Sequence, residues 1–412
     1  MFKKIFKKKE TDKMTTLSEY RLPEPTNYNG ILDIKFIYMN DHVNTIYPAC
    51  ASCYNISKDK NIDREARLGY IGRRVAVDHT SILEHSNIII EFKIPNSYLK
   101  ELTEFLGFCR YLNYKCKKYD EDTTIVLLSG SIRGFRFLIM EIDNQNNVIL
   151  TMIKQQLFEY IDKEYFIDLI KSNVIEDSFI TFEEGVESFR TLYPAKSKED
   201  DIIDIINFDN FDIIRSRIDK IFSIRDILDC ISITINFKKM SRVITQQLVR
   251  HRNAITQESQ RYVKYSGVGF NSPAKYKDKY DLNKKYTTPF GNFTLQELGD
   301  KMCEVYEYLV DQGVEKEDAR GFLPQNNQSG AVYMTFTLRT LFVFLNLRLD
   351  PHAQAEIRHY AEVIYNSIED TIIKYNIVDE YNLEEIKKYI EPRVLFESNN
   401  ENSYDLVDEI ID

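Results

Sequence analysis

The chain has 412 residues, of which 43% are hydrophobic and 29% are charged, and its formal net charge at pH 7 is −10. This composition is typical of a soluble globular protein and excludes a chain that is disordered throughout. No apolar run of about 18 residues occurs, so we expect no transmembrane helix, and the basic N-terminus lacks the apolar stretch of a signal peptide. The acidic balance argues against a nucleic-acid partner bound over the whole surface. The six cysteines are too sparse for a disulfide scaffold and favour the cytoplasm.

The first part of the chain predicts helices and strands mixed together. Residues 1–16 form a basic tail, and residues 61–78 are expected to form a helix. The isoleucine-rich run 87–94 is a strand candidate bounded by Pro95. Residues 96–229 include no histidine and no cluster of reactive side chains, so we interpret them as an inserted, mainly structural subdomain.

The second part of the chain begins with a strand candidate at 231–237, which could pair with the strand at 87–94. Residues 241–249 have apolar residues at helical spacing after Ser241, a favourable N-cap residue. We expect a loop-rich stretch at 253–293 and a long helix at 294–312. A second long helix is expected at 334–373, broken or kinked by Pro351. Residues 376–412 form a C-terminal extension with an acidic tail.

The densest group of reactive residues lies at 246–267. Between residues 238 and 275 the chain has eight Lys or Arg residues and one acid, Glu258, although the whole protein is acidic. Clustered guanidinium groups bind phosphate through charge-assisted hydrogen bonds, and amide side chains can contact a base or sugar. A run of charge alone more often forms a solvated face, but the mixture with amides favours a nucleotide or phosphate site. The residues concerned are Gln247, Arg250, His251, Arg252, Gln257, Ser259, Gln260 and Arg261.

Other patterns carry weaker signals. His79 and His85 do not have the spacing that places two metal ligands on one helical face, so we expect no metal site there. Cys50 and Cys53 form one isolated pair, which favours two unlinked structural cysteines. The chain has neither a GxGxxG nor a GxxxxGK[ST] loop, which makes a Rossmann or P-loop enzyme improbable.

Arg348, His352 and Glu356 recur at intervals of four residues. If the helix continues through Pro351, they share one face and form either part of a site or an ordinary ion-pair stripe.

Several segments, in this order, resemble the flavin-dependent thymidylate synthases, the ThyX family. The family's Arg-His-Arg string with its later Ser and Arg-Tyr is matched at 250–262, and its His-x-Ser-x-x-Glu-His segment is matched at 79–85. A Cys-Tyr pair is matched at 53–54, a Glu-x-Ala-Arg-x-x-Leu-Pro stretch at 317–324, and the last helix at 337–358. The resemblance assigns residues 17–95 and 230–375 to the enzyme core.

The inserted range 96–229 is the largest departure from the family pattern, and the chain also departs from it at three single points. Thr337 and Val343 replace two asparagines that contact the flavin, so these contacts are altered or lost. The segment between Arg252 and Ser259 is one residue shorter than usual, so either Gln257 or Glu258 takes the position of a family glutamate.

The resemblance implies an α+β fold with a mixed or antiparallel sheet, and a homotetramer whose active sites lie between subunits. It implies reductive methylation of dUMP to dTMP, with FAD as hydride carrier, NADPH as reductant and methylenetetrahydrofolate as carbon donor. Arg348 matches the arginine that favours ionisation of the pyrimidine, and His79 matches a histidine near the flavin and folate. The dUMP set is Gln247, Arg250, Gln257, Glu258, Ser259, Gln260, Arg261, Arg320 and Arg348; the FAD set is Ser81, Arg250, His251, Arg252, Gln257, Thr337, Arg339, Val343 and His352.

Two alternatives remain open. The chain could be a catalytically altered flavoenzyme that acts on another uracil nucleotide. It could also be a non-enzymatic nucleotide-binding or RNA-binding relative, in which the changes at Thr337 and Val343 have abolished flavin binding.

Overall fold

The structure is a computed structural model that describes residues 34–54, 62–76, 79–109, 111–142, 153, 202–265, 269–271, 281 and 284–374. The two tails and residues 154–201 lie outside the described residues. Within the described ranges, no helix is long and apolar enough to cross a membrane.

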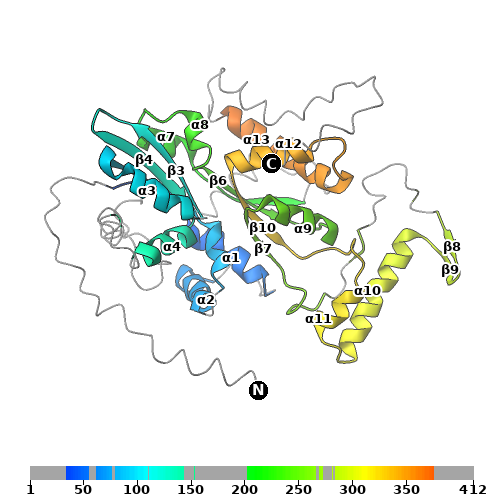
Figure 1. Cartoon of the computed structure of the whole chain (residues 1–412). Helices are drawn as coiled ribbons and strands as arrows, with labels where there is room; N and C mark the ends of the chain where they lie inside the picture. The colour runs from blue at the N-terminus through cyan, green and yellow to red at the C-terminus, as the bar shows by residue number, and fades with distance from the viewer. Residues whose placement is uncertain are drawn as a thin grey trace, which may run out of the picture.

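The first sheet is antiparallel, with strand order β1-β2-β4-β3. Four helices, α1, α2, α3 and α4, pack with it (Figure 1). The strands are β1 (Lys35–Met39), β2 (Ile88–Pro95), β3 (Leu112–Lys118) and β4 (Thr123–Gly130); the helices are α1 (His42–Ser52), α2 (Arg64–Ala76), α3 (Asn96–Phe108) and α4 (Ile132–Ile142).

The second sheet is also antiparallel, with strand order β5-β6-β10-β7. Its apolar face packs with helices α7, α9, α12 and α13 and with the short α8. The strands are β5 (Ile203–Phe208), β6 (Ser232–Phe237), β7 (Ala254–Gln257) and β10 (Val332–Thr337); the helices are α7 (Phe211–Arg217), α8 (Ile224–Ile227), α9 (Arg242–Leu248), α12 (Leu338–Arg348) and α13 (Ala355–Lys374).

The apolar run in β2 is buried on both faces. Side chains alternate across a strand, so Ile88, Ile90 and Phe92 enter the core beneath α1 to α4, whereas Ile89 enters the core shared with the second sheet. A strand buried on both faces has no polar face, which explains why this run is almost continuously apolar.

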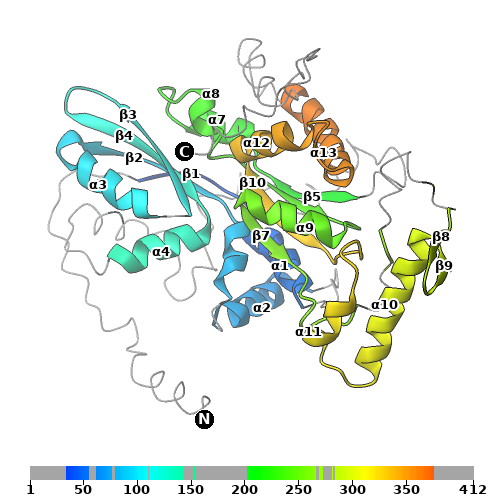
Figure 2. The ribbon, with the colours of Figure 1, turned by 45° about the vertical axis from the view of Figure 1, so that its right-hand side comes forward.

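A third group of elements forms an arm at the periphery of the molecule. It comprises α10 (Leu295–Asp311), α11 (Lys316–Ala319) and the hairpin of β8 (Tyr286–Thr288) and β9 (Gly291–Phe293). Figures 1 and 2 both show this arm projecting away from the two sheets. A small core, which includes Val263, Tyr265 and Tyr306, connects the arm to the segment that follows β7.

Three sequence expectations need correction. The strands at 87–94 and 231–237 do not pair with each other, because β2 pairs with β1 and β4, whereas β6 pairs with β5 and β10. The expected helix at 334–373 starts as strand β10 and is interrupted after Arg348. The stretch at 253–293 includes β7, β8 and β9, so it is less irregular than expected.

The interpretation of residues 96–229 as an inserted subdomain also needs correction. In the described residues of this range, β3 and β4 extend the sheet of β2, and β5 pairs with β6. These strands are therefore integral to both sheets. Burial on both faces of β2 and β4 requires this arrangement, because each needs a neighbour to satisfy its backbone hydrogen bonds.

Asp209 ties the two sheets together at the end of β5. Its carboxylate accepts hydrogen bonds from Asn87 Nδ2 at 2.7 Å, Ser232 N at 2.7 Å and Asn207 Nδ2 at 2.9 Å. Burial raises the pKa of Asp209 to about 6, against the opposing effect of these donors.

Candidate active site

The Arg-His-Arg string follows α9 on a single turn of 3-10 helix, η6 (Val249–His251). The buried Glu356 carboxylate accepts from Ser241 N at 2.7 Å and Ser241 Oγ at 2.6 Å, so negative charge stabilises the N-terminus of α9. At the other end, Arg252 has a φ of 51°, and this left-handed residue turns the chain into β7. Arg250 and Arg252 are exposed as a result.

His251 and Arg348 form the closest contact within the candidate set. Arg348 Nε donates to His251 Nε2 at 3.0 Å, and the His251 ring lies edge-on to Phe344 with ring centres 5.0 Å apart. Burial and the Arg348 charge lower the pKa of His251 to about 4, so the imidazole is neutral. Because Arg348 donates to Nε2, the neutral ring carries its proton on Nδ1. This contact holds a charged guanidinium in one orientation.

The segment after His251 supplies amide and carboxylate groups. Gln257 Nε2 donates to Ser329 Oγ at 3.1 Å, and the Glu258 carboxylate lies so close to Gly330 that a Cβ there would be 2.3 Å from Glu258 Oε2. Among the described residues, Gln260 Nε2 is buried without a hydrogen-bond partner. A buried amide of this kind is costly unless a ligand or water completes it.

Arg261 and Arg320 meet at Glu317. Arg261 Nε donates to Glu317 Oε2 at 2.9 Å, and Arg320 Nε donates to the Glu317 backbone carbonyl at 3.1 Å. Arg320 lies in the 3-10 turn η8 (Arg320–Phe322), which follows α11. Burial and the Arg320 charge lower the pKa of Arg242, so positive charge is concentrated here.

The two histidines of the upstream motif have different surroundings. His79 Nδ1 lies 3.2 Å from Tyr54 Oη, and burial and the Arg74 charge lower the pKa of His79. His85 ends the 3-10 helix η4 (Thr80–His85) and is fully buried, with its ring nitrogens 2.9 Å from Thr335 Oγ1 and 2.7 Å from Thr256 Oγ1. His85 therefore joins η4 to the polar face of the second sheet. Ser81 is half-buried on the same turn.

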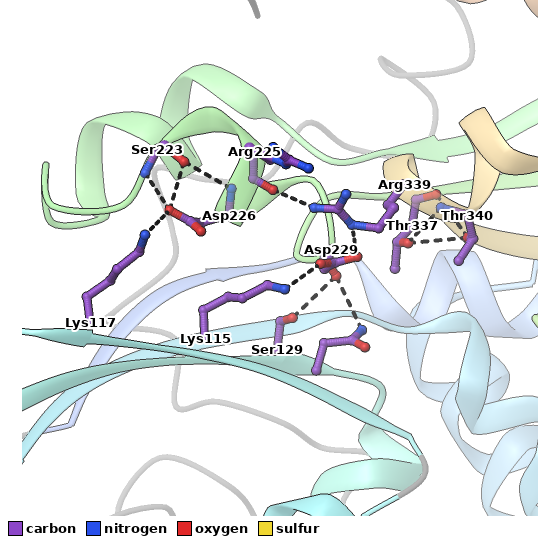
Figure 3. A network of polar contacts seen from close by, with 11 residues as sticks. Lys115, Lys117, Ser129, Ser223, Arg225, Asp226, Asp229, Thr337, Arg339 and Thr340 are labelled. Atoms are coloured by element: carbon purple, nitrogen blue, oxygen red, sulfur yellow. Dashed lines mark hydrogen bonds and ion pairs between the residues drawn. The ribbon is translucent and has the colours of Figure 1, made fainter. Parts of the chain in front are cut away.

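Arg339 lies at the other end of α12 from Arg348, in the polar network drawn in Figure 3. Its Nε donates to Asp229 Oδ1 at 2.7 Å and its Nη2 to the Arg225 carbonyl at 2.6 Å. Lys115 Nζ of β3 lies 3.1 Å from Asp229 Oδ2, so Asp229 connects the two sheets. The structure does not bring Arg339 together with the His251–Arg348 pair.

The two positions that depart from the family pattern also lie next to or on α12. Thr337 is its N-cap residue and accepts from Thr340 N at 3.2 Å. Val343 is 45% exposed, on the same side of the helix as Arg339.

The expected stripe of Arg348, His352 and Glu356 does not form. Helix α12 ends at Arg348 and α13 begins at Ala355, because Pro351 cannot continue the helix. His352 instead contacts Asp350, with Nδ1 to Oδ1 at 3.0 Å, and its side chain is 81% exposed.

Gln354 was not assigned a role from the sequence. In the structure its side-chain oxygen accepts a hydrogen bond from Gln247 Nε2. These residues lie 107 positions apart, so no local pattern could have revealed the pair.

The six cysteines are free, and five of them are buried. Burial raises the pKa of Cys50 to about 12 and that of Cys53 to about 11. A high thiol pKa leaves little of the nucleophilic anion near neutral pH. We therefore predict that replacing any one cysteine with alanine leaves the turnover of the folded protein within a few-fold. A thousandfold loss in one variant without unfolding would indicate covalent catalysis.

Comparisons with known proteins agree with the sequence motifs. Residues 182–372 match the family described as Thymidylate synthase complementing protein. The flavin-dependent thymidylate synthase of Geobacter sulfurreducens is 37% identical over 147 residues, which is 35% of this chain and 60% of that protein. Those of Pyrococcus furiosus and Kosmotoga olearia are 35% and 34% identical, over 33% and 30% of this chain and 53% and 56% of those proteins.

The matched part therefore spans little more than half of these curated relatives. The family match includes residues 182–229, part of the range interpreted above as an insertion. A solved UMP/dUMP methylase from Streptomyces cacaoi has 20% identity and a TM-score of 0.32, with 43% of this chain and 95% of that chain covered. The family match and the curated matches agree with the flavin-dependent thymidylate synthase motifs in the sequence.

Proposed function

We propose that this protein catalyses the reductive methylation of dUMP to dTMP. The observation that carries the proposal is the arrangement of η6 and the end of α12, where neutral His251 fixes the Arg348 guanidinium at 3.0 Å. Burial and the Arg250 charge lower the pKa of Arg348, so Arg250 adds a second cation beside this pair. The curated relatives named flavin-dependent thymidylate synthase support the choice of reaction.

Carbon 5 of uracil is a poor nucleophile, and this arrangement addresses that difficulty. A fixed guanidinium near the ring stabilises negative charge that develops on it, and arginine remains protonated at any working pH. We assign this role to Arg348, with His251 orienting it. Because His251 accepts at Nε2, it cannot protonate the ring from that atom while the contact lasts.

The remaining proposed dUMP contacts fall into two groups, one for the phosphate and one for the sugar and base. Arg250, Arg261 and Arg320 supply cations for the phosphate, since guanidinium groups pair with phosphate oxygens in a bidentate manner. Gln247, Ser259 and the buried Gln260 amide supply donors and acceptors for sugar and base. Gln257 and Glu258 both lie against residues 329–331, so both remain candidates for the family glutamate position.

The residues present fit an anionic cofactor at η6 and β7. Arg250 and Arg252 are exposed there, and Asn253 Nδ2 is buried without a partner among the described residues. We propose that FAD is held by these residues with Ser81, His251 and Gln257, and that His352 and the α12 positions Thr337, Arg339 and Val343 lie further along the site. When bound, FAD supplies hydride chemistry, with NADPH as reductant and methylenetetrahydrofolate as carbon donor near His79.

We also propose a cytoplasmic homotetramer. Helix α10 presents exposed apolar side chains at helical spacing, namely Leu298, Met302, Val305 and Tyr308. An exposed apolar stripe on a projecting arm is typical of a protein interface, and Arg320 lies beside this arm. Neighbouring subunits would then complete each other's sites.

The absorption spectrum of the purified protein tests this proposal most directly. We expect the protein to copurify with noncovalently bound FAD and to form dTMP from dUMP with NADPH and methylenetetrahydrofolate. A colourless protein that gains no flavin on reconstitution would contradict the assignment. A flavin-containing protein that acts on UMP but not on dUMP would instead favour an altered uracil-nucleotide flavoenzyme.

A further inference from the structure

Four side chains form a connected set of tyrosine and arginine contacts at the edge of the candidate site. Helix α2 supplies Tyr70 and Arg74, and Arg74 Nη2 donates to Tyr70 Oη at 3.2 Å. The Arg74 guanidinium carbon lies 3.9 Å from the centre of the Tyr54 ring and 4.9 Å from that of Tyr70. The Tyr54 ring in turn stacks on Tyr262, with ring centres 6.1 Å apart and planes inclined by 22°.

This set reaches two residues of the candidate site. Tyr54 Oη contacts His79 Nδ1 at 3.2 Å, and the Arg261 guanidinium lies 5.5 Å from the centre of the Tyr262 ring. Tyr262 itself is 57% exposed, so its own packing does not hold it in place. Its ring stacks on Tyr54, and Tyr54 in turn lies against the Arg74 guanidinium.

We propose that Arg74 is a positioning residue of the active site: it fixes Tyr54, and through Tyr54 it orders Tyr262 beside Arg261 and holds His79 in place. A planar guanidinium can stack on a tyrosine face and donate hydrogen bonds at its edge at the same time, which lysine cannot do. Among the described residues, Arg74 Nε is buried without a hydrogen-bond partner, so the tyrosine rings provide its main contacts. The role in dUMP binding rests on the function proposed above; the contact with His79 does not.

The pKa of His79 can report whether Arg74 has this positioning role, because it depends on the charges around the imidazole. The groups that face His79 and Tyr54 from the neighbouring elements are Cys50, Cys53, Tyr70, Arg74 and Tyr262, with Glu258 beside Cys53. Burial raises the pKa values of the two thiols and of Tyr54 and Tyr70, so these groups are neutral near pH 7. Arg74 is the cation that disfavours the imidazolium form of His79, in addition to burial.

The first experiment compares Arg74→Met with Arg73→Met in the ligand-free full chain. Arg73 is the adjacent exposed arginine of α2 and lies 5.8 Å from the Tyr70 ring centre, so its variant controls for the loss of one helix charge. The imidazole of His79 is titrated by NMR, with its signals assigned from a His79→Gln variant. We expect the pKa of His79 to rise toward its ordinary value in Arg74→Met and to change little in Arg73→Met.

The second experiment separates charge from shape. Arg74→Lys retains the cation but loses the planar stack, so we expect the His79 titration to stay close to that of the wild type. The affinity for dUMP should nevertheless fall by about threefold to tenfold, as it should in Arg74→Met, because Tyr262 and Arg261 lose their support. Arg73→Met should bind dUMP as the wild type does.

An unchanged His79 titration in folded Arg74→Met, confirmed by circular dichroism, would overturn the positioning role. So would wild-type dUMP affinity in both Arg74 variants. If the wild-type protein does not bind dUMP at all, the proposed function fails, whereas the His79 titration still decides whether Arg74 controls that histidine.

Discussion

Replacement of Arg348 with lysine is expected to lower turnover by more than tenfold, which corresponds to about 1.4 kcal/mol or more of activation free energy. The variant keeps a positive charge but loses the planar guanidinium whose Nε contacts His251. If Arg348 stabilises charge that builds on the pyrimidine, its loss affects the transition state more than the bound ground state. Single-turnover flavin oxidation and dUMP affinity, measured on the same preparation, test this expectation.

Arg261→Ala is the matched control, and we expect the reverse pattern. Arg261 is exposed and pairs with Glu317 at the edge of the site, so its loss should weaken dUMP binding more than it slows turnover. If Arg348→Lys loses only dUMP affinity and retains its oxidation rate, Arg348 is not the residue that activates the ring.

Replacement of His85 with alanine is expected to lower the free energy of unfolding by about 3 kcal/mol or more. The change removes a fully buried ring and leaves the hydroxyls of Thr256 and Thr335 without the partner that joins them to η4. His352→Ala, at an exposed position, should change stability by less than about 0.5 kcal/mol. Urea unfolding of both variants measures these changes in the free energy of unfolding. Equal changes in the two variants would show that the buried contacts of His85 contribute little to stability.

The same histidine should make stability depend on pH. Burial lowers the pKa of His85 from 6.5 to about 3, so its contribution is fully present above pH 6.5 and is lost as the pH falls from 6.5 toward 3. The limiting slope for one proton is about 1.4 kcal/mol per pH unit. A His85→Gln variant should lose this slope, whereas the opposite dependence of Asp209, whose pKa is raised from 3.8 to about 6, is common to both proteins and cancels.

Local sequence patterns predicted several elements correctly. The strand at 87–94 is β2, the strand at 231–237 is β6, and the helix at 294–312 is α10, which begins with the capping box of Thr294 and Glu297. These features depend on the periodicity and caps of a few neighbouring residues, so they can be recognised without tertiary contacts. The partners of each strand could not be predicted in the same way. Both faces of β2 are apolar, so no alternation of apolar and polar residues indicated which strands pair with it.

In the candidate site, too, some features follow from local sequence and others only from tertiary contacts. The sequence by itself determined the motif residues and their order, and it placed Arg250, His251 and Arg252 together because they are consecutive. Only the tertiary structure decided that His251 orients Arg348, that Arg339 is bound to Asp229, and that Pro351 separates Arg348 from His352. It also brought Arg74, Tyr54 and Tyr262 together from three separate segments. Contacts between residues far apart in the chain arise from how helices and sheets pack, which no local pattern of residues specifies.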